Sequence, residues 1–515
     1  MNTSHSDHSR VVRTLLVGFV LLFVHPAHAE PAAPVPFDFA AVASKARALA
    51  AKPYVRDDGG LPEQFAKLDY DAYQEIRFKS DRALWRGEGL QFQLQLFHRG
   101  NMFRDRVAIN VVDQGTPTRI AYSPELFDFG AARPPAPLPP DLGFAGVKID
   151  YPLRRDGSFE DVAIFLGASY FRAAGLGQIY GLSARALAVD TGLPKAEEFP
   201  IFREFWIAKP AQEAGALTIY ALLDSPSVSG AYRFDLKPGY QLTVDVQSRL
   251  FFRKPVDRLG MAPLTSMFFH GENTDRFMDD FRPEVHDSDG LLMARSNGEW
   301  LWRPLNNPRQ LRISVFREEN PVGFGLLKRD RNPDHYQDFG ASYQLRPSVW
   351  VEARGEWGRG AVYLIEIPSD AEKYDNIVAF WVPDAPIKEG SELAFDYRLH
   401  FLLDESMAPQ NGRVVATRVS ASPGKSDRPR RHFVVDFAGE ALGRLSPQAR
   451  LVADVGSSSG QIGKLSVEKN DALGIWRVSF DLEREEDQDP VELRAVLKAG
   501  ADVLSETWIY QWSAR

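Results

Sequence analysis

The 515-residue chain contains no cysteine. This absence excludes disulfides, thiolate metal sites and cysteine nucleophiles together. Three common nucleotide and zinc-protease signatures are also missing: a P-loop, GxGxxG and HExxH. The formal net charge is −8, whereas binding to phosphate backbones requires a basic surface. The sequence therefore argues against nucleic-acid partners and against nucleotide chemistry.

The N-terminus has the pattern of an export signal. Arg10 and Arg13 precede an apolar run over 15–24, and Ala27 and Ala29 provide a small-residue cleavage site. The run is about ten residues, roughly half of what a membrane-spanning helix needs. No twin-arginine pair is present, which favours the general secretion (Sec) route. We expect residues 1–29 to be a signal peptide.

Periodicity predicts helices only at the start of the mature chain, over 37–51 and 62–67, with helix or turn over 70–76. Alternating strand patterns then follow one another with few helical periods between them, which predicts an antiparallel β-sandwich over 37–403. Linker composition appears at 404–413. Short strands over 414–515 have the spacing of an immunoglobulin-like sandwich. The fold class predicted is all-β, with a large and a small sandwich.

Acidic and aromatic residues gather in two segments, 282–291 and 298–308, and Asp375 precedes an apolar strand. Glycoside hydrolysis uses one carboxylic acid to protonate the leaving oxygen and a second carboxylate as base or nucleophile. Ordinary polar turns would contain the same residues. From the residues alone, a glycoside hydrolase site and a set of structural turns therefore both remain possible. Asp287 to Gly290 matches only a fragment of a calcium loop, and we expect no metal site.

Several strings together resemble the periplasmic glucan biosynthesis family of the G and D types, over essentially the whole mature chain. They are 167–172 (GASYFR), 180–185 (YGLSAR), 262–268 (APLTSMF), 286–288 (HDS), 302–308 (WRPLNNP) and 375–378 (DNIV). Further strings resemble the G type more closely: 197–200 (EEFP), 203–207 (REFWI), 223–226 (LDSP) and 504–508 (LSETW).

The resemblance implies a periplasmic role in making osmoregulated glucans with a β-1,2-linked backbone. It also implies a galactose-mutarotase-like large sandwich, an immunoglobulin-like small one, and an anomer-inverting mechanism. By motif, Asp375 would be the general acid and Asp287 the general base. An inverting pair stands about 6.5–9.5 Å apart, or further where water relays the proton. The acid needs a raised pKa, which burial near Tyr374 and Trp381 or the charge of Asp370 would provide.

We expect a further set of side chains to stack on sugars and to bond their hydroxyls: His286, Trp302, Arg303, Tyr336, Trp350 and Trp357. The expected partner is linear β-1,2-glucan, without a cofactor. The resemblance also suggests contact with the inner-membrane glucan synthase and a homodimer. Three functions remain open at this point: a hydrolase, a transglycosylase that branches or cyclises the glucan, and a noncatalytic glucan-binding partner of the synthase.

Overall fold

The computed structural model describes residues 36–132, 138–408, 411–422, 430–446, 448–484 and 490–513. The predicted signal peptide, residues 1–29, lies outside these described residues. Helices α1 (Phe39–Ala50), α2 (Glu63–Ala66) and α3 (Tyr70–Gln74) confirm the three predicted helical segments. Asp38 caps α1 by accepting a hydrogen bond from the backbone N–H of Ala41 at 3.0 Å. The remaining structure is mostly strand, so the all-β prediction is confirmed.

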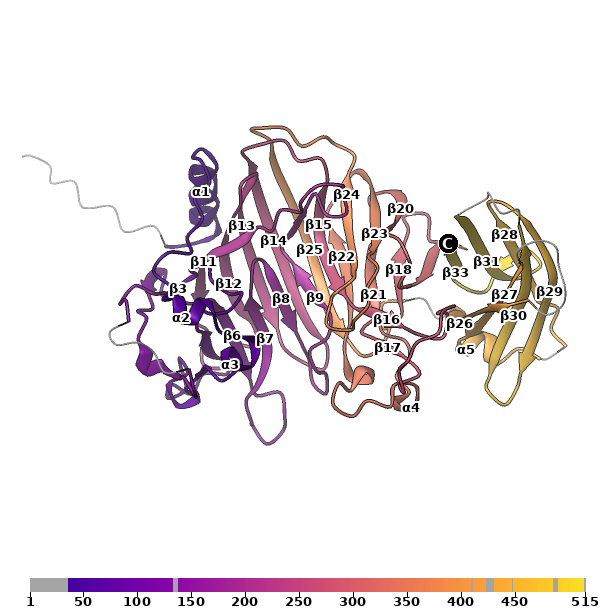
Figure 1. The fold of residues 1–515 in the computed structure, drawn as a ribbon, viewed down its shortest axis with the longest axis horizontal. Coiled ribbons are helices and arrows are strands. Elements are labelled where there is room, and N and C mark those ends of the chain that lie inside the picture. The colour runs from indigo at the N-terminus through magenta and orange to yellow at the C-terminus, as the bar shows by residue number, and fades with distance from the viewer. Residues whose placement is uncertain are drawn as a thin grey trace, which may run out of the picture. The chain divides into compact units, whose positions relative to one another are not determined.

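Two large sheets form the main sandwich (Figure 1). The ten-stranded sheet has the order β2 (Gln93–Phe97), β6 (Gly146–Tyr151), β7 (Glu160–Leu166), β8 (Tyr170–Ala173), β9 (Ser183–Arg185), β15 (Leu259–Ser266), β24 (Ile377–Pro383), β23 (Arg359–Glu366) and β20 (Arg312–Glu319), with β10 (Leu187–Val189) also paired to β15.

The fifteen-stranded sheet has the order β28 (Val452–Ser457), β31 (Val491–Ala499), β33 (Thr507–Trp512), β19 (Trp300–Pro304), β18 (Gly290–Ala294), β21 (Gly323–Leu327), β22 (Ser348–Arg354), β25 (Glu392–Leu402), β14 (Leu242–Phe252), β13 (Val228–Lys237), β12 (Leu217–Asp224), β11 (Ile201–Ala208), β3 (Ala108–Asp113) and β4 (Thr116–Arg119), with β32 (Asp502–Val503) paired to β31. Two small pairs complete this part: β1 (Arg77–Phe78) with β5 (Phe127–Asp128), and β16 (Phe268–His270) with β17 (Val285–His286).

The main core lies between the two large sheets. Strand β14 shows the alternation that produces it, because Leu242, Val244 and Val246 are buried while the residues between them are partly exposed. Across the core, Phe165 of one sheet contacts Phe234 of the other edge to face, with ring centroids 5.2 Å apart. The stability that cysteine cannot provide thus comes from a large aromatic and aliphatic core.

The C-terminal strands form a second core. A four-stranded sheet of β26 (Arg413–Ala421), β27 (Arg430–Ala438), β30 (Ile475–Glu483) and β29 (Gln461–Asn470) packs against β31 and β33, and α5 (Glu440–Gly443) lies beside it. Trp476 is buried there and donates a hydrogen bond to the carbonyl oxygen of Leu442 at 3.0 Å.

The fifteen-stranded sheet continues from the large sandwich into these C-terminal strands. Trp302 of β19 pairs with Trp508 of β33 in parallel register. The predicted linker 404–413 lies between β25 and β26. The division into separately folding domains at that linker stays a prediction.

Candidate functional site

A cleft of about 1540 Å³ opens over β2, β7, β8 and β9 of the ten-stranded sheet. Its walls combine aromatic rings with arginines and carboxylates, which is the composition that sugar-binding sites use. The lining aromatic residues are Tyr54, Tyr70, Tyr73, Phe78, Phe97, Phe103, Tyr170, Phe171, Tyr180 and Phe199. Tyr70 and Phe199 are 56% and 48% exposed, so both offer a ring face to a ligand.

Asp375 lines this cleft at the start of β24. The next residue fixes its position, because the Asn376 side chain accepts from the N–H of Phe268 at 2.8 Å and donates to its carbonyl oxygen at 3.0 Å. The Asp375 side chain is 35% exposed, and its Oδ2 lies 3.9 Å from an Arg172 guanidinium nitrogen. The backbone beside Asp375 is therefore tied to β16, while the carboxyl group remains accessible from the cleft.

The pKa of Asp375 is raised above its ordinary value. Desolvation by the surrounding protein is the largest cause, and the negative charge of Asp287 raises the pKa further. Arg172 and Arg346 act in the opposite direction. The raised pKa matches the sequence expectation for a general acid. The negative charge that raises the pKa of Asp375 is that of Asp287, however, and not that of Asp370.

Asp287 lies between β17 and β18 and is only 4% exposed. Its backbone N–H donates to the carbonyl oxygen of Met267 at 2.8 Å, and its carboxylate forms an ion pair with Arg346. Asp287 is not among the residues that line the large cleft. Its charge nevertheless acts on Asp375, and Arg346 acts on both carboxylates. The two predicted acids thus form one electrostatic unit with different environments.

His286 is fully enclosed behind Asp287. Its ring stacks on Phe268 with centroids 5.0 Å apart, and its Nε2 lies 2.7 Å from Glu284 Oε2. Burial is the main reason that the pKa of His286 falls to about 3, with the Lys328 cation adding to the effect. A neutral, enclosed ring orients its neighbours, and it has no exposed face for a sugar.

The predicted stacking residues Trp302 and Trp350 are also buried, each at 3% exposure. The Arg329 guanidinium covers the Trp302 ring at 3.5 Å, and Trp300 stacks on Trp350 with centroids 5.6 Å apart. Both rings belong to the second core, which β19 and β22 share with the C-terminal strands. Protein atoms therefore occupy the faces that were expected to bind sugar.

Arg303, Tyr336 and Trp357 are buried as well. Arg303 forms an ion pair with the fully buried Glu366 at 3.2 Å, and Tyr336 donates to a backbone carbonyl oxygen at 3.0 Å. The Trp357 Nε1–H likewise donates to a backbone carbonyl oxygen at 3.1 Å. None of these three lines the cleft. The five predicted contact residues other than His286 are thus all buried, as large aromatic side chains and paired cations inside proteins commonly are, and their contact with sugar stays a prediction.

The cleft residues that the sequence interpretation missed come from strings that it had already singled out. Tyr170 and Arg172 lie in 167–172, while Tyr180 and Ser183 lie in 180–185, and all four line the cleft. The Tyr180 hydroxyl has no hydrogen-bond partner among the described residues, although its oxygen is buried. These two sequence strings therefore locate the cleft wall better than the choice of tryptophans as sugar-stacking residues did.

The fold and the cleft define a two-sheet β-sandwich protein whose large aromatic and charged cleft suits a carbohydrate chain. The chain belongs to the family described as "Periplasmic glucan biosynthesis protein, MdoG", whose model matches residues 37–512. No helix among the described residues is both long and apolar enough to cross a membrane.

Curated relatives carry both names of the family. The chain is 48% identical to "Glucans biosynthesis protein D 1" of Ralstonia nicotianae, over 98% of each chain. It is 47% identical to "Glucans biosynthesis protein G 1" of Shewanella oneidensis, over 93% of this chain and 87% of that one. It is also 47% identical to "Glucans biosynthesis protein G" of Ralstonia nicotianae, over 94% and 97%. Involvement in periplasmic glucan biosynthesis follows from family membership.

Proposed function

We propose that this protein is an inverting glycoside hydrolase that processes the β-1,2-glucan backbone during periplasmic glucan biosynthesis. The observation that carries the proposal is the unequal pair of carboxylates. Asp375 is accessible from the cleft and has a raised pKa, whereas Asp287 is paired with Arg346. Two acids whose environments differ in this way suit the roles of acid and base.

In the proposed reaction, protonated Asp375 donates its proton to the glycosidic oxygen as the bond to the anomeric carbon breaks. Water attacks that carbon from the opposite face, and its proton passes to Asp287. Because Asp287 is 4% exposed, that proton would travel through an intervening water or sugar hydroxyl. The product would then be a reducing end of inverted configuration.

Purified protein incubated with linear β-1,2-glucan tests this proposal through product length, linkage and early anomeric configuration. Hydrolysis yields shorter linear chains, transfer yields new linkages or rings, and a noncatalytic partner leaves the glucan unchanged. If the protein binds the glucan but leaves it unchanged, the enzymatic proposal is overturned.

Asp375→Asn tests the acid directly. We expect turnover to fall by about 10²–10⁴-fold, the usual contribution of a general acid, while glucan binding persists. Asp370→Asn is the matched control, because Asp370 is an exposed aspartate shortly before Asp375 in the chain. Undiminished turnover in Asp375→Asn would remove this residue from the mechanism.

A further inference from the structure

A small cavity of about 40 Å³ is lined in part by His286 and shares no lining residue with the large cleft. Its lining includes four carboxylates, Glu272, Glu284, Asp289 and Asp330, and one arginine, Arg329. One wall is formed by residues 414–417 at the start of β26. A cavity of this size has room for a small ion together with a water molecule.

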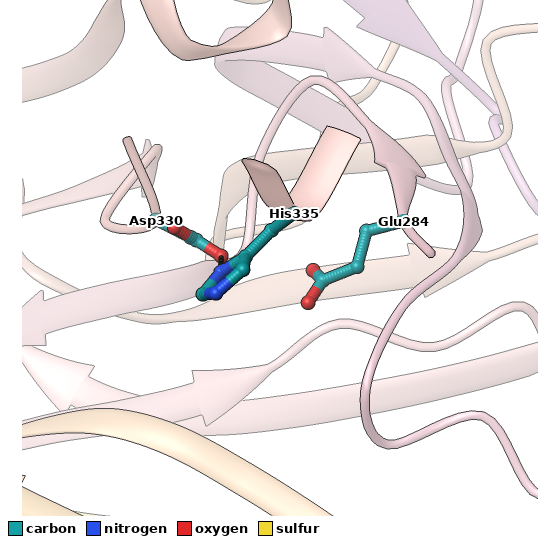
Figure 2. A group of neighbouring side chains, drawn as sticks. All are labelled: Glu284, Asp330 and His335. Carbon is teal, nitrogen blue, oxygen red and sulfur yellow. Dashed lines mark hydrogen bonds and ion pairs between the residues drawn. The ribbon is translucent and has the colours of Figure 1, made fainter. Parts of the chain in front are cut away.

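Two of the lining residues, Glu284 and Asp330, converge with His335 from different elements (Figure 2). Glu284 precedes β17, Asp330 follows β21, and His335 lies on α4 (Pro333–Tyr336). One ligand atom from each lies within 4.8 Å of the others. Since a carboxylate only accepts, the His335 Nδ1–H donates to Asp330 Oδ2. Figure 2 shows the Glu284 carboxylate facing this pair without a bond to either residue.

Glu284 contributes a carboxylate oxygen without a partner. The residue is 7% exposed, and its Oε2 is 2.7 Å from His286 Nε2. No described residue donates a hydrogen bond to its second oxygen, Oε1. The Lys328 ammonium can only donate, so it donates to His286 Nδ1 at 3.2 Å and leaves the ring proton on Nε2. His286 therefore orients Glu284 and has no lone pair left for a metal.

The charges around the cavity do not balance. Arg329, the cation in the lining, pairs with Glu405 and Glu506, which lie outside it. Glu272 pairs with Arg418. Among the described residues, no lysine or arginine side chain forms an ion pair with Glu284, Asp289 or Asp330. A buried group of carboxylates in low dielectric requires a compensating cation or protonation.

We propose that Glu284, Asp330 and His335 bind one divalent cation of the Zn²⁺ class, and that the ion displaces to solvent the proton that His335 Nδ1 donates to Asp330. Two carboxylates and one imidazole provide three protein ligands, and the cavity leaves room for a water in the fourth position. The His286 contact to Glu284 is the type of second hydrogen bond that orients metal ligands. Because Glu284 lies three residues before Asp287, the bound ion would fix the segment that carries the proposed base.

The test is direct binding of Zn²⁺ to chelator-stripped protein, followed by calorimetry and by metal analysis after dialysis. We expect one tightly bound Zn²⁺ that depends on these residues, and a higher Tm when it is bound. Glu284→Gln and His335→Asn should each weaken binding at least tenfold. The His335 side chain is 48% exposed, so His335→Asn tests the site even where Glu284→Gln fails to fold.

His400→Gln is the matched control. It removes a similar histidine–carboxylate contact, in which His400 Nε2 lies 2.9 Å from Glu352 Oε2, at a position outside this cavity. This variant should bind Zn²⁺ as the wild type does. Failure of the stripped wild-type protein to bind Zn²⁺, or unchanged affinity in His335→Asn, would overturn the proposal. Neither result involves glucan, so the hydrolase proposal is tested separately.

Discussion

Arg172 should lower the upper pH limit of the proposed reaction. Its guanidinium lies 3.9 Å from the Asp375 carboxylate, and it lowers the pKa that burial and Asp287 raise. Arg172→Gln removes this charge while keeping a polar side chain. The Asp375 carboxylate then loses a stabilising partner, so its pKa should rise further.

The size of the effect follows from the exposure of both groups. The Arg172 and Asp375 side chains are 46% and 35% exposed, so a water-like dielectric applies to their interaction. At this separation two unit charges in water interact by about 1 kcal/mol, which corresponds to ~0.7 of a pH unit. A general acid works only when it is protonated, so activity is lost as pH rises through its pKa. Arg172→Gln should therefore move the alkaline limb upward by about that amount.

The measurement is the pH profile of kcat/KM on linear β-1,2-glucan, which reports the pKa values of the free enzyme. Because Arg172 lines the cleft, its replacement can also change the maximum value of kcat/KM. Only the pH at which the alkaline limb falls therefore tests the effect on the Asp375 pKa. Arg172→Lys keeps the charge and should leave the limb nearly unmoved. Arg154→Gln, which breaks an exposed ion pair with Glu160 outside the cleft, should not move it at all. A downward shift, or none, in folded Arg172→Gln would refute this account of the Asp375 pKa.

Two further predictions concern stability. Burial lowers the pKa of His98 to about 4, and its ring donates to a backbone carbonyl oxygen at 2.6 Å and accepts from the Tyr122 hydroxyl at 2.8 Å. As pH falls, the His98 ring takes up a proton in the unfolded chain before it does so in the folded protein. About 3 kcal/mol of stability should therefore be lost between pH 6.5 and pH 4. Denaturant titrations of His98→Gln should show a smaller loss over the same pH range. Arg329 is buried between Glu405 and Glu506, at 2.9 and 2.6 Å. Because Arg329→Met leaves both buried carboxylates without their cation, it should lower the free energy of unfolding by about 3–5 kcal/mol. A loss below ~1 kcal/mol would contradict a stabilising role for Arg329.

The sequence predicted most of the fold because its signals are local. The spacing of apolar residues over 37–51 specifies α1, and strand alternation specifies the sheets. The pairing of β19 with β33 could not be predicted, because it joins residues roughly 200 positions apart and leaves no periodic signal. Continuity of one sheet across a predicted linker is a property of tertiary packing alone.

The candidate site was predicted unevenly for a similar reason. Motif similarity identified Asp287 and Asp375, which interact electrostatically in the structure. Choosing contact residues by residue type selected Trp302 and Trp350, which are buried in the second core. Composition cannot distinguish a ring that faces a cleft from one that faces a core, since both environments favour the same aromatic side chains. Arg172 was recognisable only through the string that contains it.

The segment from Glu284 to Asp289 explains why residues far from the cleft should influence its chemistry. Asp287 faces Arg346, His286 is locked against Phe268, and Asp289 accepts a hydrogen bond from the backbone N–H of Asp330 at 3.2 Å. Asp287, His286 and Asp289 thus each contact a residue outside this segment, so we expect movement of the proposed base to be coupled to the buried carboxylates beside it. A change that loosens Glu284 should therefore reduce turnover through Asp287 while leaving the Asp375 side of the cleft intact. Such a variant would lower kcat more than it alters glucan binding, which is the behaviour of a positioning residue.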